Sequence, residues 1–224
     1  MTRLLDIFFS FLAIVLLSPL LVPVMIALKL TGEHDIFYRQ TRIGRGGRPF
    51  GVYKFATMLR NSANMAGGFL TQKDDPRILP LGGFLRKTKI NELPQLFNIL
   101  LGDMSFVGPR PQAKPHYDLY SAEVKAHIDR IPPGLTGIGS LVFRDEESLL
   151  DGAADRDAFH DRIIAPYKGE LEVWYCRHRN LVTYFLLVFM TAWAVVCPRT
   201  RLYLRVFRDL PPAPKELEKL FAEA

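Results

Sequence analysis

The sequence has few of the residues and motifs that mark disulfide-bonded, metal-centred or common nucleotide-binding proteins. Its two cysteines, Cys176 and Cys197, form no disulfide framework and show no metal-ligand spacing, so we expect both to be reduced and structural. Its five histidines show no ligand spacing either. The sequence has no Walker loop, no GxGxxG turn, no Ser-His-Asp signature of the α/β-hydrolase type and no internal repeat. The candidate function must therefore rest on other chemistry.

Nucleic-acid-binding signatures are also missing, although the chain is basic. Its 29 lysines and arginines give a formal net charge of +6, which suits nucleic acid, anionic lipid head groups or phosphorylated substrates. The basic residues form no RNA- or DNA-binding motif, and the apolar residues concentrate near the two ends of the chain. We therefore expect membrane lipid, and no nucleic acid, among the partners.

A long apolar run occupies residues 7–30, which reaches the roughly 20 residues that a membrane span needs. The run is longer than the apolar region of a signal peptide, and it continues into Lys29 without a small-residue cleavage site. Ser18-Pro19 interrupts its middle and Pro23 follows, so we expect a kink near Ser18. Proline alone leaves two topologies open, namely a kinked spanning helix and a helix that enters and leaves on one face.

A second apolar run covers residues 181–197, where 17 residues are at the short limit for a span. This run can either cross the membrane or lie in its plane. The tail after it alternates basic and apolar residues, which fits a segment bound near anionic lipid.

Basic residues flank both ends of the first apolar run, residues 7–30, which favours a cytoplasmic position for both of those ends. The alternative is that these charges simply orient a spanning helix.

Residues 36–58 are predicted to form a β-hairpin, because Tyr38, Val52, Tyr53 and Phe55 have strand propensity and Gly46-Gly47 supplies the turn. Lys54 lies in the second predicted strand and is a candidate for orienting phosphates. The alternative for Lys54 is an ordinary solvated surface charge.

The densest set of groups suited to phosphate chemistry lies between residues 75 and 111. Apolar residues of 89–101 recur at helical spacing, which predicts an amphipathic helix that stops at Gly102. Asn91 and Glu92 would lie near the start of this helix, where unsatisfied N–H groups favour anions. The charged members of the stretch are the basic pair Arg86 and Lys87, the carboxylates Glu92 and Asp103, and Arg110, which stands between two prolines.

This stretch resembles the core of the bacterial sugar transferase family, the monotopic phosphoglycosyl transferases. In that family an arginine-lysine-threonine precedes aspartate-glutamate-leucine-proline-glutamine-leucine, and an asparagine, glycine-aspartate-methionine-serine and glycine-proline-arginine-proline follow. One position departs from the pattern, because the family's catalytic aspartate falls at Asn91. The resemblance covers nearly the whole chain. The matching residues are Arg86, Lys87, Thr88, Glu92, Leu93, Pro94, Gln95, Leu96, Asn98, Gly102 to Ser105 and Gly108 to Pro111.

The resemblance implies an α+β fold that is mostly helical, with a small β-hairpin and interfacial amphipathic helices. It also implies that Ser18-Pro19 bends the first helix into a re-entrant membrane helix with both ends cytoplasmic. We expect residues 1–32 to form this helix, residues 33–180 a cytoplasmic transferase domain, and residues 181–224 a membrane-associated segment. The expected location is the bacterial inner membrane, with the catalytic domain on its cytoplasmic face.

The function that the resemblance implies is transfer of a sugar 1-phosphate from a UDP-sugar to polyprenyl (undecaprenyl) phosphate. The products would be a polyprenyl diphospho-sugar and UMP, at the initiating step of surface glycan biosynthesis. Mg²⁺ is the expected cofactor, because a diphosphate needs its charge neutralised. A homodimer is a further candidate assembly. The alternative function is a catalytically silent, membrane-anchored binding or scaffold protein of the same fold.

The candidate roles follow from the chemistry of each side chain. Glu92 is the best candidate metal ligand and Asp103 a weaker one, since Asp103 can instead cap the following turn. Arg110, held between Pro109 and Pro111, offers a planar fork for two phosphate oxygens. The remaining candidates for binding phosphate are Arg86, Lys87, Pro111 and Lys54.

Asn91 raises a separate question, because the family mechanism uses an aspartate that attacks the β-phosphate. An asparagine amide is neutral and its nitrogen lone pair is delocalised, so Asn91 is not expected to be a nucleophile. Four readings stay open. The asparagine can be an engineered change made to trap a substrate complex, the lipid phosphate can attack directly, or the protein can be a silent binder. In the fourth reading a neighbouring carboxylate acts instead, and the candidates are Glu92, Asp145, Glu146 and Glu147.

Overall fold

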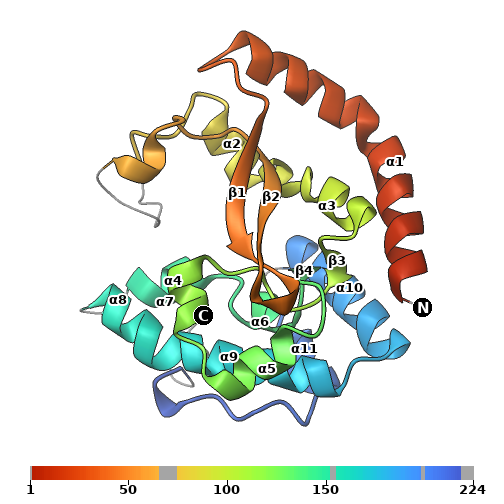
Figure 1. The fold of residues 1–224 in the computed structure, drawn as a ribbon, viewed down its shortest axis with the longest axis vertical. Helices are drawn as coiled ribbons and strands as arrows, with labels where there is room; N and C mark the ends of the chain where they lie inside the picture. The colour runs from red at the N-terminus through yellow and green to blue at the C-terminus, as the bar shows by residue number, and fades with distance from the viewer. Residues whose placement is uncertain (1, 66–74, 152–154, 198–199, 218–224) are drawn as a thin grey trace. The chain divides into compact units, whose positions relative to one another are not determined.

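The computed structural model describes residues 2–65, 75–151, 155–197 and 200–217. Helices dominate, and two small two-stranded sheets accompany them (Figure 1). The mostly helical α+β prediction is therefore confirmed. The chain divides into two compact units. The first unit comprises residues 3–41 and 51–101, and the second comprises residues 42–50 and the described residues from 102 onward.

The first unit is built around the C-terminal half of the first helix. Its buried apolar core contains Leu21 and Leu28 of α1, Phe55 of β2 and Leu85 of α2. Partly buried apolar side chains surround this core and exclude water from it. The elements are α1 (Thr2–Leu30), β1 (Phe37–Ile43), β2 (Pro49–Phe55), η2 (Ser62–Asn64), α2 (Gly82–Lys87), η3 (Ile90–Glu92) and α3 (Gln95–Leu101).

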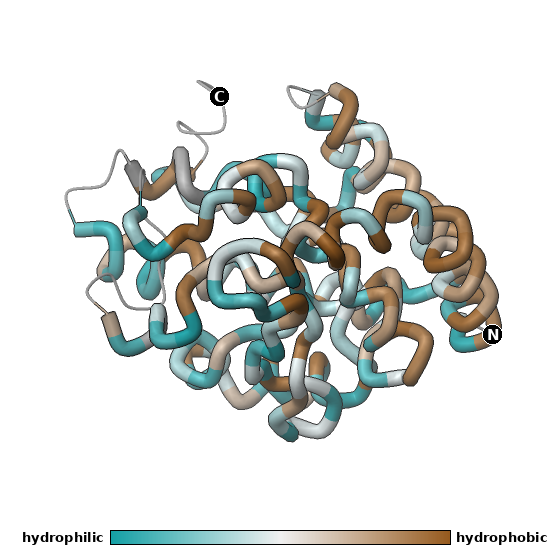
Figure 2. Tube along the Cα trace, turned by 90° about the horizontal axis from the view of Figure 1, so that it is seen from above, coloured by the Kyte–Doolittle hydropathy of each residue, from teal (hydrophilic) through white to brown (hydrophobic). Residues whose placement is uncertain are grey.

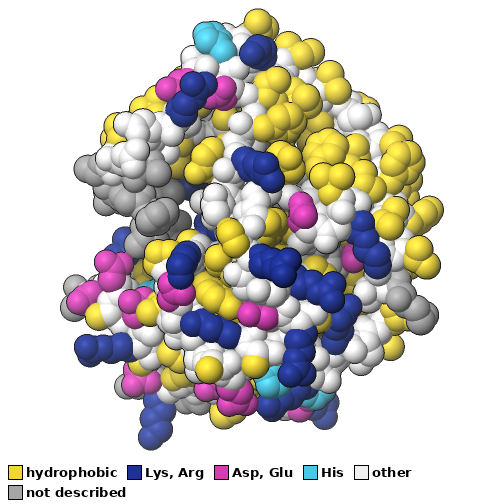
Figure 3. All heavy atoms as spheres, viewed as in Figure 1, with side chains coloured by type: hydrophobic (Ala, Val, Ile, Leu, Met, Phe, Trp, Pro, Cys, Tyr) yellow, Lys and Arg dark blue, Asp and Glu magenta, His cyan; other side chains and the backbone are white. Residues whose placement is uncertain are grey.

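Helix α1 is long and apolar enough, by length and composition, to cross a membrane. Only 11% of its most apolar window is buried. Figure 2 shows hydrophobic colour along most of this helix, and in Figure 3 hydrophobic side chains gather over the region that α1 occupies. A water-exposed face of this kind is unfavourable in a soluble protein. Together with the family described below, it indicates association with a membrane.

The middle of α1 contains the predicted proline break, but the helix continues through it. Pro19 and Pro23 both lie inside α1, and Figure 1 shows that the helix bends along its length. Pro19 has no N–H to donate to the carbonyl of Val15, four residues earlier. The Ser18 hydroxyl donates to that carbonyl instead, at 2.8 Å. Ser18 therefore compensates locally for the hydrogen bond that Pro19 removes.

Both ends of α1 contact the first unit. Near the N-terminus, the Arg3 guanidinium donates to the carbonyl of Ile99 and, at 2.7 Å, to that of Leu100. Near the C-terminus, Leu28 is 2% exposed and packs in the core with Phe55. Helix α1 is thus fixed at two separated points on one compact body.

The predicted hairpin is present, with β1 and β2 forming an antiparallel pair. Its turn is the short helical segment η1 (Arg45–Gly47), in which Gly46 and Gly47 have φ angles of 73° and 67°. These left-handed angles favour glycine, so the predicted Gly46-Gly47 turn is confirmed. In the second unit, the Gly46 N–H donates to the carbonyl of Asp129 at 2.8 Å, and this fixes the tip.

The second unit packs helices around a short parallel strand pair. In this pair Ser105 lies opposite Gly134 and Val107 opposite Thr136. Helix α9 contacts α5 and α6, and α10 contacts α6 and both strands. The elements are β3 (Ser105–Val107), α4 (Lys114–Asp118), α5 (Ala122–Ile128), β4 (Gly134–Thr136), α6 (Ile138–Val142), α7 (Glu146–Asp151), α8 (Arg156–Phe159), η4 (His160–Ile164), α9 (Ala165–Arg177), α10 (Leu181–Val196) and α11 (Leu202–Val206).

Candidate active site

The predicted helix over residues 89–101 is wrong as a single element. The structure has a 3₁₀ turn, η3, followed by α3, which begins only at Gln95. Lys89 adopts a left-handed conformation with φ 60°, which starts the turn sharply, and Pro94 has no N–H for a continuing helix. The end of α3 agrees with the prediction, because Gly102 follows it with φ 102°.

This local geometry also changes the expected anion site. The N–H groups of Glu92 and Leu93 donate to the carbonyls of Lys89 and Ile90, both at 3.1 Å. Those of Leu96 and Phe97 donate to carbonyls three residues earlier, both at 3.0 Å. These four N–H groups are satisfied within the chain and are not available to an anion. That an anion binds at the start of this segment stays a prediction.

Asn91 and Glu92 form a small polar group in the first unit. Asn91 is 7% exposed, and its Oδ1 is buried without a hydrogen-bond partner among the described residues. A buried carbonyl oxygen of this kind costs stability unless a ligand or water satisfies it. Glu92 Oε1 lies 3.5 Å from Lys54 Nζ, and about a fifth of each of these two side chains is exposed, 21% and 20%. The first unit therefore offers a partly exposed carboxylate and ammonium, together with a buried, unsatisfied amide oxygen at the neighbouring position in the chain.

Asn98 holds the strand that carries Lys54, a role that we did not predict. The Asn98 side chain is 0% exposed and makes two hydrogen bonds with the backbone of β2. Its Oδ1 accepts from the Tyr53 N–H and its Nδ2 donates to the Gly51 carbonyl, both at 2.8 Å. Because both of its polar groups bond to β2, the Asn98 amide joins α3 to the strand that carries Lys54. The sequence did carry one signal of this role, because Asn98 is a polar residue within an apolar helical pattern.

Replacing Asn98 with alanine should destabilise the first unit. The change removes two hydrogen bonds and leaves two buried backbone groups unsatisfied, which costs about 2–3 kcal/mol. For a protein of this size the melting temperature should fall by roughly 4–10 °C. Thermal unfolding of purified protein measures this, with Asn64→Ala as the control, since Asn64 is exposed in the same unit. Equal melting temperatures for the two variants would show that Asn98 does not join α3 to β2.

The predicted basic pair lies in the last turn of α2, where a helix favours positive charge. Arg86 is partly buried, and its Nη1 lies 3.6 Å from the sulfur of Met58. Lys87 is exposed. Both side chains belong to the first unit, as do Asn91 and Glu92.

Arg110 and Pro111 belong to the second unit, in a turn fixed by backbone hydrogen bonds. The Gly108 N–H donates to the carbonyl of Thr136 at 2.9 Å, and the Gly134 N–H donates to that of Pro109 at 2.8 Å. The Arg110 side chain is exposed and Pro111 is partly buried. The structure therefore holds the backbone of this turn firmly while the guanidinium is accessible.

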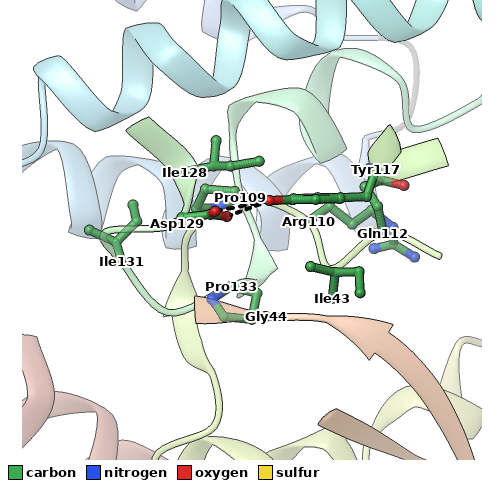
Figure 4. A pocket seen from close by; sticks show the side chains of 10 residues that line it. All are labelled: Ile43, Gly44, Pro109, Arg110, Gln112, Tyr117, Ile128, Asp129, Ile131 and Pro133. Atoms are coloured by element: carbon green, nitrogen blue, oxygen red, sulfur yellow. Dashed lines mark hydrogen bonds between the residues drawn. The ribbon is translucent and has the colours of Figure 1, made fainter. Parts of the chain in front are cut away.

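A small cavity of about 20 Å³ lies behind this turn (Figure 4). Beside it, the Tyr117 hydroxyl donates to an Asp129 carboxylate oxygen at 2.9 Å. Burial, together with Asp129, raises the pKa of Tyr117 to about 12, so Tyr117 stays protonated. A cavity of this size holds about one water molecule. A phosphorylated substrate would therefore have to meet Arg110 from its exposed side.

The remaining candidate carboxylates also lie in the second unit, in different environments. Asp103 and Asp145 are exposed. Glu146 is partly buried, where its Oε2 accepts from Lys168 Nζ at 2.6 Å and its Oε1 lies 3.6 Å from His160 Nε2. Glu146 is therefore engaged by two basic groups of its own unit. The side chain of Glu147 lies outside the described residues.

The sequence matches the family described as "Bacterial sugar transferase" over residues 1–198, most of its length. The chain belongs to the bacterial sugar transferase family. The resemblance of the core motif is therefore confirmed, and the departure at Asn91 is a departure within the family. This sugar transferase carries its family core in both compact units, since the match runs through residue 198.

Three relatives illustrate the family. The UDP-glucose:undecaprenyl-phosphate glucose-1-phosphate transferase of Escherichia coli (strain K12) is 35% identical over 187 residues, which are 82% of this chain and 38% of that protein. A transferase of the same name from Caulobacter vibrioides is 41% identical over 167 residues, 73% of this chain and 60% of that protein. The exopolysaccharide production protein ExoY of Sinorhizobium fredii is 34% identical over 208 residues, 87% of this chain and 84% of that protein. The chain thus spans less than half of the E. coli relative but most of ExoY.

Proposed function

We propose that this sugar transferase moves a sugar 1-phosphate from a UDP-sugar to undecaprenyl phosphate, giving undecaprenyl diphospho-sugar and UMP. The observation that carries the proposal is the family match over residues 1–198, together with relatives named for this reaction. ExoY is named for exopolysaccharide production, so we assign the reaction to the start of surface glycan biosynthesis. The predicted homodimer and the absence of a nucleic-acid partner stay predictions.

The polar groups in the two units match the needs of this reaction. A diphosphate requires positive charge and directed donors. The first unit offers Lys54 beside Glu92, and the second unit, taken by itself, offers the exposed guanidinium of Arg110. The unsatisfied Oδ1 of Asn91 is buried and can accept a hydrogen bond from an internal water molecule. Glu92 supplies a carboxylate at the next position in the chain. We assign the attack on the β-phosphate either to the Glu92 carboxylate or to the lipid phosphate itself. UMP release by a Glu92→Gln variant tests whether the Glu92 carboxylate is needed.

Mg²⁺ remains the proposed cofactor, and the first unit offers one carboxylate, Glu92, to hold it. No group of three His, Cys, Asp or Glu side chains that could hold a metal occurs among the described residues. Mg²⁺ commonly binds through one or two carboxylates while substrate phosphates and water complete its shell. Glu92 would hold it, with the amide oxygen of Asn91 as a neutral neighbour. When bound, the ion neutralises charge on the diphosphate.

We further propose that α1 is re-entrant, with both of its ends on the cytoplasmic face of the inner membrane. Support comes from the two contacts that α1 makes with one body, through Arg3 near its start and Leu28 near its end. A helix that crossed the membrane would separate these two ends by roughly 30 Å of hydrocarbon. The Ser18-Pro19 break supplies the bend that a re-entrant path needs.

Replacing Pro19 with alanine should straighten α1. Alanine restores the N–H that can donate to the Val15 carbonyl and removes the clash of the proline ring. Labelling of single cysteines at positions 2 and 34 in sealed membrane vesicles measures the topology. Both positions should be labelled from the same side in the parent protein, and from opposite sides in Pro19→Ala. Pro115→Ala is the control outside α1, and unchanged labelling in Pro19→Ala would show that proline does not set the bend.

UMP release tests the proposed function directly. Purified protein in lipid with undecaprenyl phosphate is incubated with a panel of UDP-sugars, with and without Mg²⁺. We expect UMP and a lipid-linked diphospho-sugar from at least one UDP-sugar, and little product without Mg²⁺ or without the lipid phosphate. Binding of UDP-sugar without any UMP release would contradict the proposal and favour a silent binding protein.

A further inference from the structure

A carboxylate buried in the second unit lies against the backbone of the turn that carries Arg110. Glu172 is on α9 and is 2% exposed. Its Oε1 accepts a hydrogen bond from the Arg110 N–H at 3.4 Å, which is long for such a bond. Its Oε2 is buried and has no hydrogen-bond partner among the described residues. A buried carboxylate with one unsatisfied oxygen costs folding stability, so packing alone does not account for it.

The backbone around this carboxylate leaves room for no additional side chain. A Cβ atom at Gly139 of α6 would lie 2.5 Å from Glu172 Oε1, well inside van der Waals contact. A Cβ atom at Gly137 would lie 2.4 Å from the carbonyl oxygen of Gly108, in the same turn as Arg110. The two glycines therefore let α6, the carboxylate and the turn approach closely. The Glu172 side chain can reach the turn only because residue 139 is a glycine, which has no Cβ atom in its path.

The electrostatic surroundings make Glu172 sensitive to pH near neutrality. Burial raises the pKa of Glu172 to about 7, while the Arg110 N–H and the charges of Lys168 and Arg110 oppose that rise. Burial lowers the pKa of Lys168, and Glu146 opposes this shift. Four groups interact electrostatically with Glu172, namely Lys168 and Cys176 on its own helix, Arg110 in the turn and Tyr120 before α5. Glu146, at the start of α7, acts indirectly through its ion pair with Lys168.

We propose that Glu172 is a positioning residue of the transferase, whose ionised carboxylate anchors the Arg110 backbone and so directs the guanidinium toward the substrate diphosphate. The inference rests on the proposed function, in which Arg110 binds phosphate. Anchoring strengthens when Glu172 is charged, because hydrogen bonds to a charged acceptor are stronger than those to a neutral one. The affinity for UDP-sugar should therefore rise between about pH 6 and about pH 8, as Glu172 ionises.

Ionisation of Glu172 should raise the affinity for UDP-sugar but lower the folding stability. These opposite effects distinguish a positioning residue from one that only supports the fold. Because the pKa in the fold is above the ordinary value of 4.5, ionisation of Glu172 reduces stability as the pH rises toward 7. Glu172→Gln removes this cost. At about pH 8 it should leave the melting temperature unchanged or higher while weakening UDP-sugar binding. A side chain that only supports the fold would lose stability and activity together.

The first experiment compares Glu172→Gln with the parent protein and with Glu170→Gln, a control on the exposed side of the same helix. KM and kcat for UDP-sugar are measured from UMP release across pH. Glu172→Gln should raise KM about tenfold at high pH, as expected for losing a charge-assisted hydrogen bond, and should flatten the pH dependence of KM. An unchanged KM profile, or a loss confined to kcat with a lower melting temperature, overturns the proposal.

The second experiment uses the match between positions 139 and 172, in case Glu172→Gln fails to fold. Gly139→Ala should displace the carboxylate from Arg110 and raise KM. Adding Glu172→Asp shortens the acid by one methylene and should restore KM to within about threefold of the parent value. A double variant no better than Gly139→Ala alone overturns the proposal.

Hydrogen exchange gives a third readout that needs no enzymatic activity. Within residues 108–112 only Gly108, Arg110 and Gln112 have amide N–H groups, because positions 109 and 111 are prolines. Glu172→Gln should speed exchange at Arg110 relative to the parent protein at high pH, with Gly108 unchanged. Equal exchange at Arg110 overturns the anchoring. If the parent protein releases no UMP, the proposed function fails, and this exchange measurement alone still decides whether Glu172 anchors Arg110.

Discussion

Replacing Glu92 with glutamine is expected to lower UMP release by about 100- to 1,000-fold while the protein still folds. Among the described residues of the first unit, the other carboxylates that are not buried, Glu33 and Asp35, accept hydrogen bonds from Arg60. Glu92 instead lies 3.5 Å from Lys54 and follows Asn91, whose buried amide oxygen is unsatisfied, directly in the chain. Glutamine keeps the size of the side chain but removes the charge that attack on phosphorus or binding of Mg²⁺ requires.

The stability of this variant should change little, because a partly exposed ion pair contributes about 0–1 kcal/mol. Steady-state UMP release, together with the melting temperature, therefore separates a chemical role from a structural one. Glu123→Gln is the matched control, since Glu123 is exposed in the second unit. Turnover of Glu92→Gln within threefold of the control, with the fold intact, would contradict the role of Glu92 and direct attention to Asp103 and Asp145.

Local features of the fold followed from local sequence rules. Gly46-Gly47 and Gly102 adopt positive φ angles, which few other residues tolerate, so a turn and a helix end could be read directly. The amphipathic pattern of residues 89–101 predicted a continuous helix that the structure does not have. Spacing of apolar side chains is almost the same for a 3₁₀ turn followed by a helix, and the left-handed Lys89 leaves no trace in that spacing.

Long-range contacts were beyond the reach of the sequence. Asn98 bonds residues 45 and 47 positions away, and Glu172 bonds Arg110 across 62 positions. Neither pairing produces a periodic pattern, because each depends on how separate elements pack. The family core drew attention to Arg110 and Glu92, which carry charge in a dense motif. It gave no reason to single out a glutamate in a helix 80 residues after Glu92.

Replacing Asn91 with aspartate is expected not to raise turnover near neutral pH. The Asn91 side chain is 7% exposed and its Oδ1 has no hydrogen-bond partner among the described residues. A carboxylate there would be buried beside Glu92 and beside an anionic diphosphate. Burial and like charge both raise the pKa of a carboxyl group, so the new acid should hold a proton. A protonated carboxyl group is a poor nucleophile, and the substitution also removes the amide donor.

The test compares UMP release and Mg²⁺ demand of Asn91→Asp and the parent protein at about pH 7 and about pH 9. We expect equal or lower turnover at neutral pH, where the new acid is protonated. At about pH 9 we expect a higher Mg²⁺ requirement, because the ionised acid adds a negative charge that the cation must offset. Asn64→Asp is the control, since Asn64 is exposed in the same unit. A tenfold gain, with a phospho-sugar adduct found on residue 91 by mass spectrometry, would contradict this expectation. Position 91 would then be the nucleophile site, and Glu92 would act by binding the metal ion or the substrate rather than by attacking phosphorus.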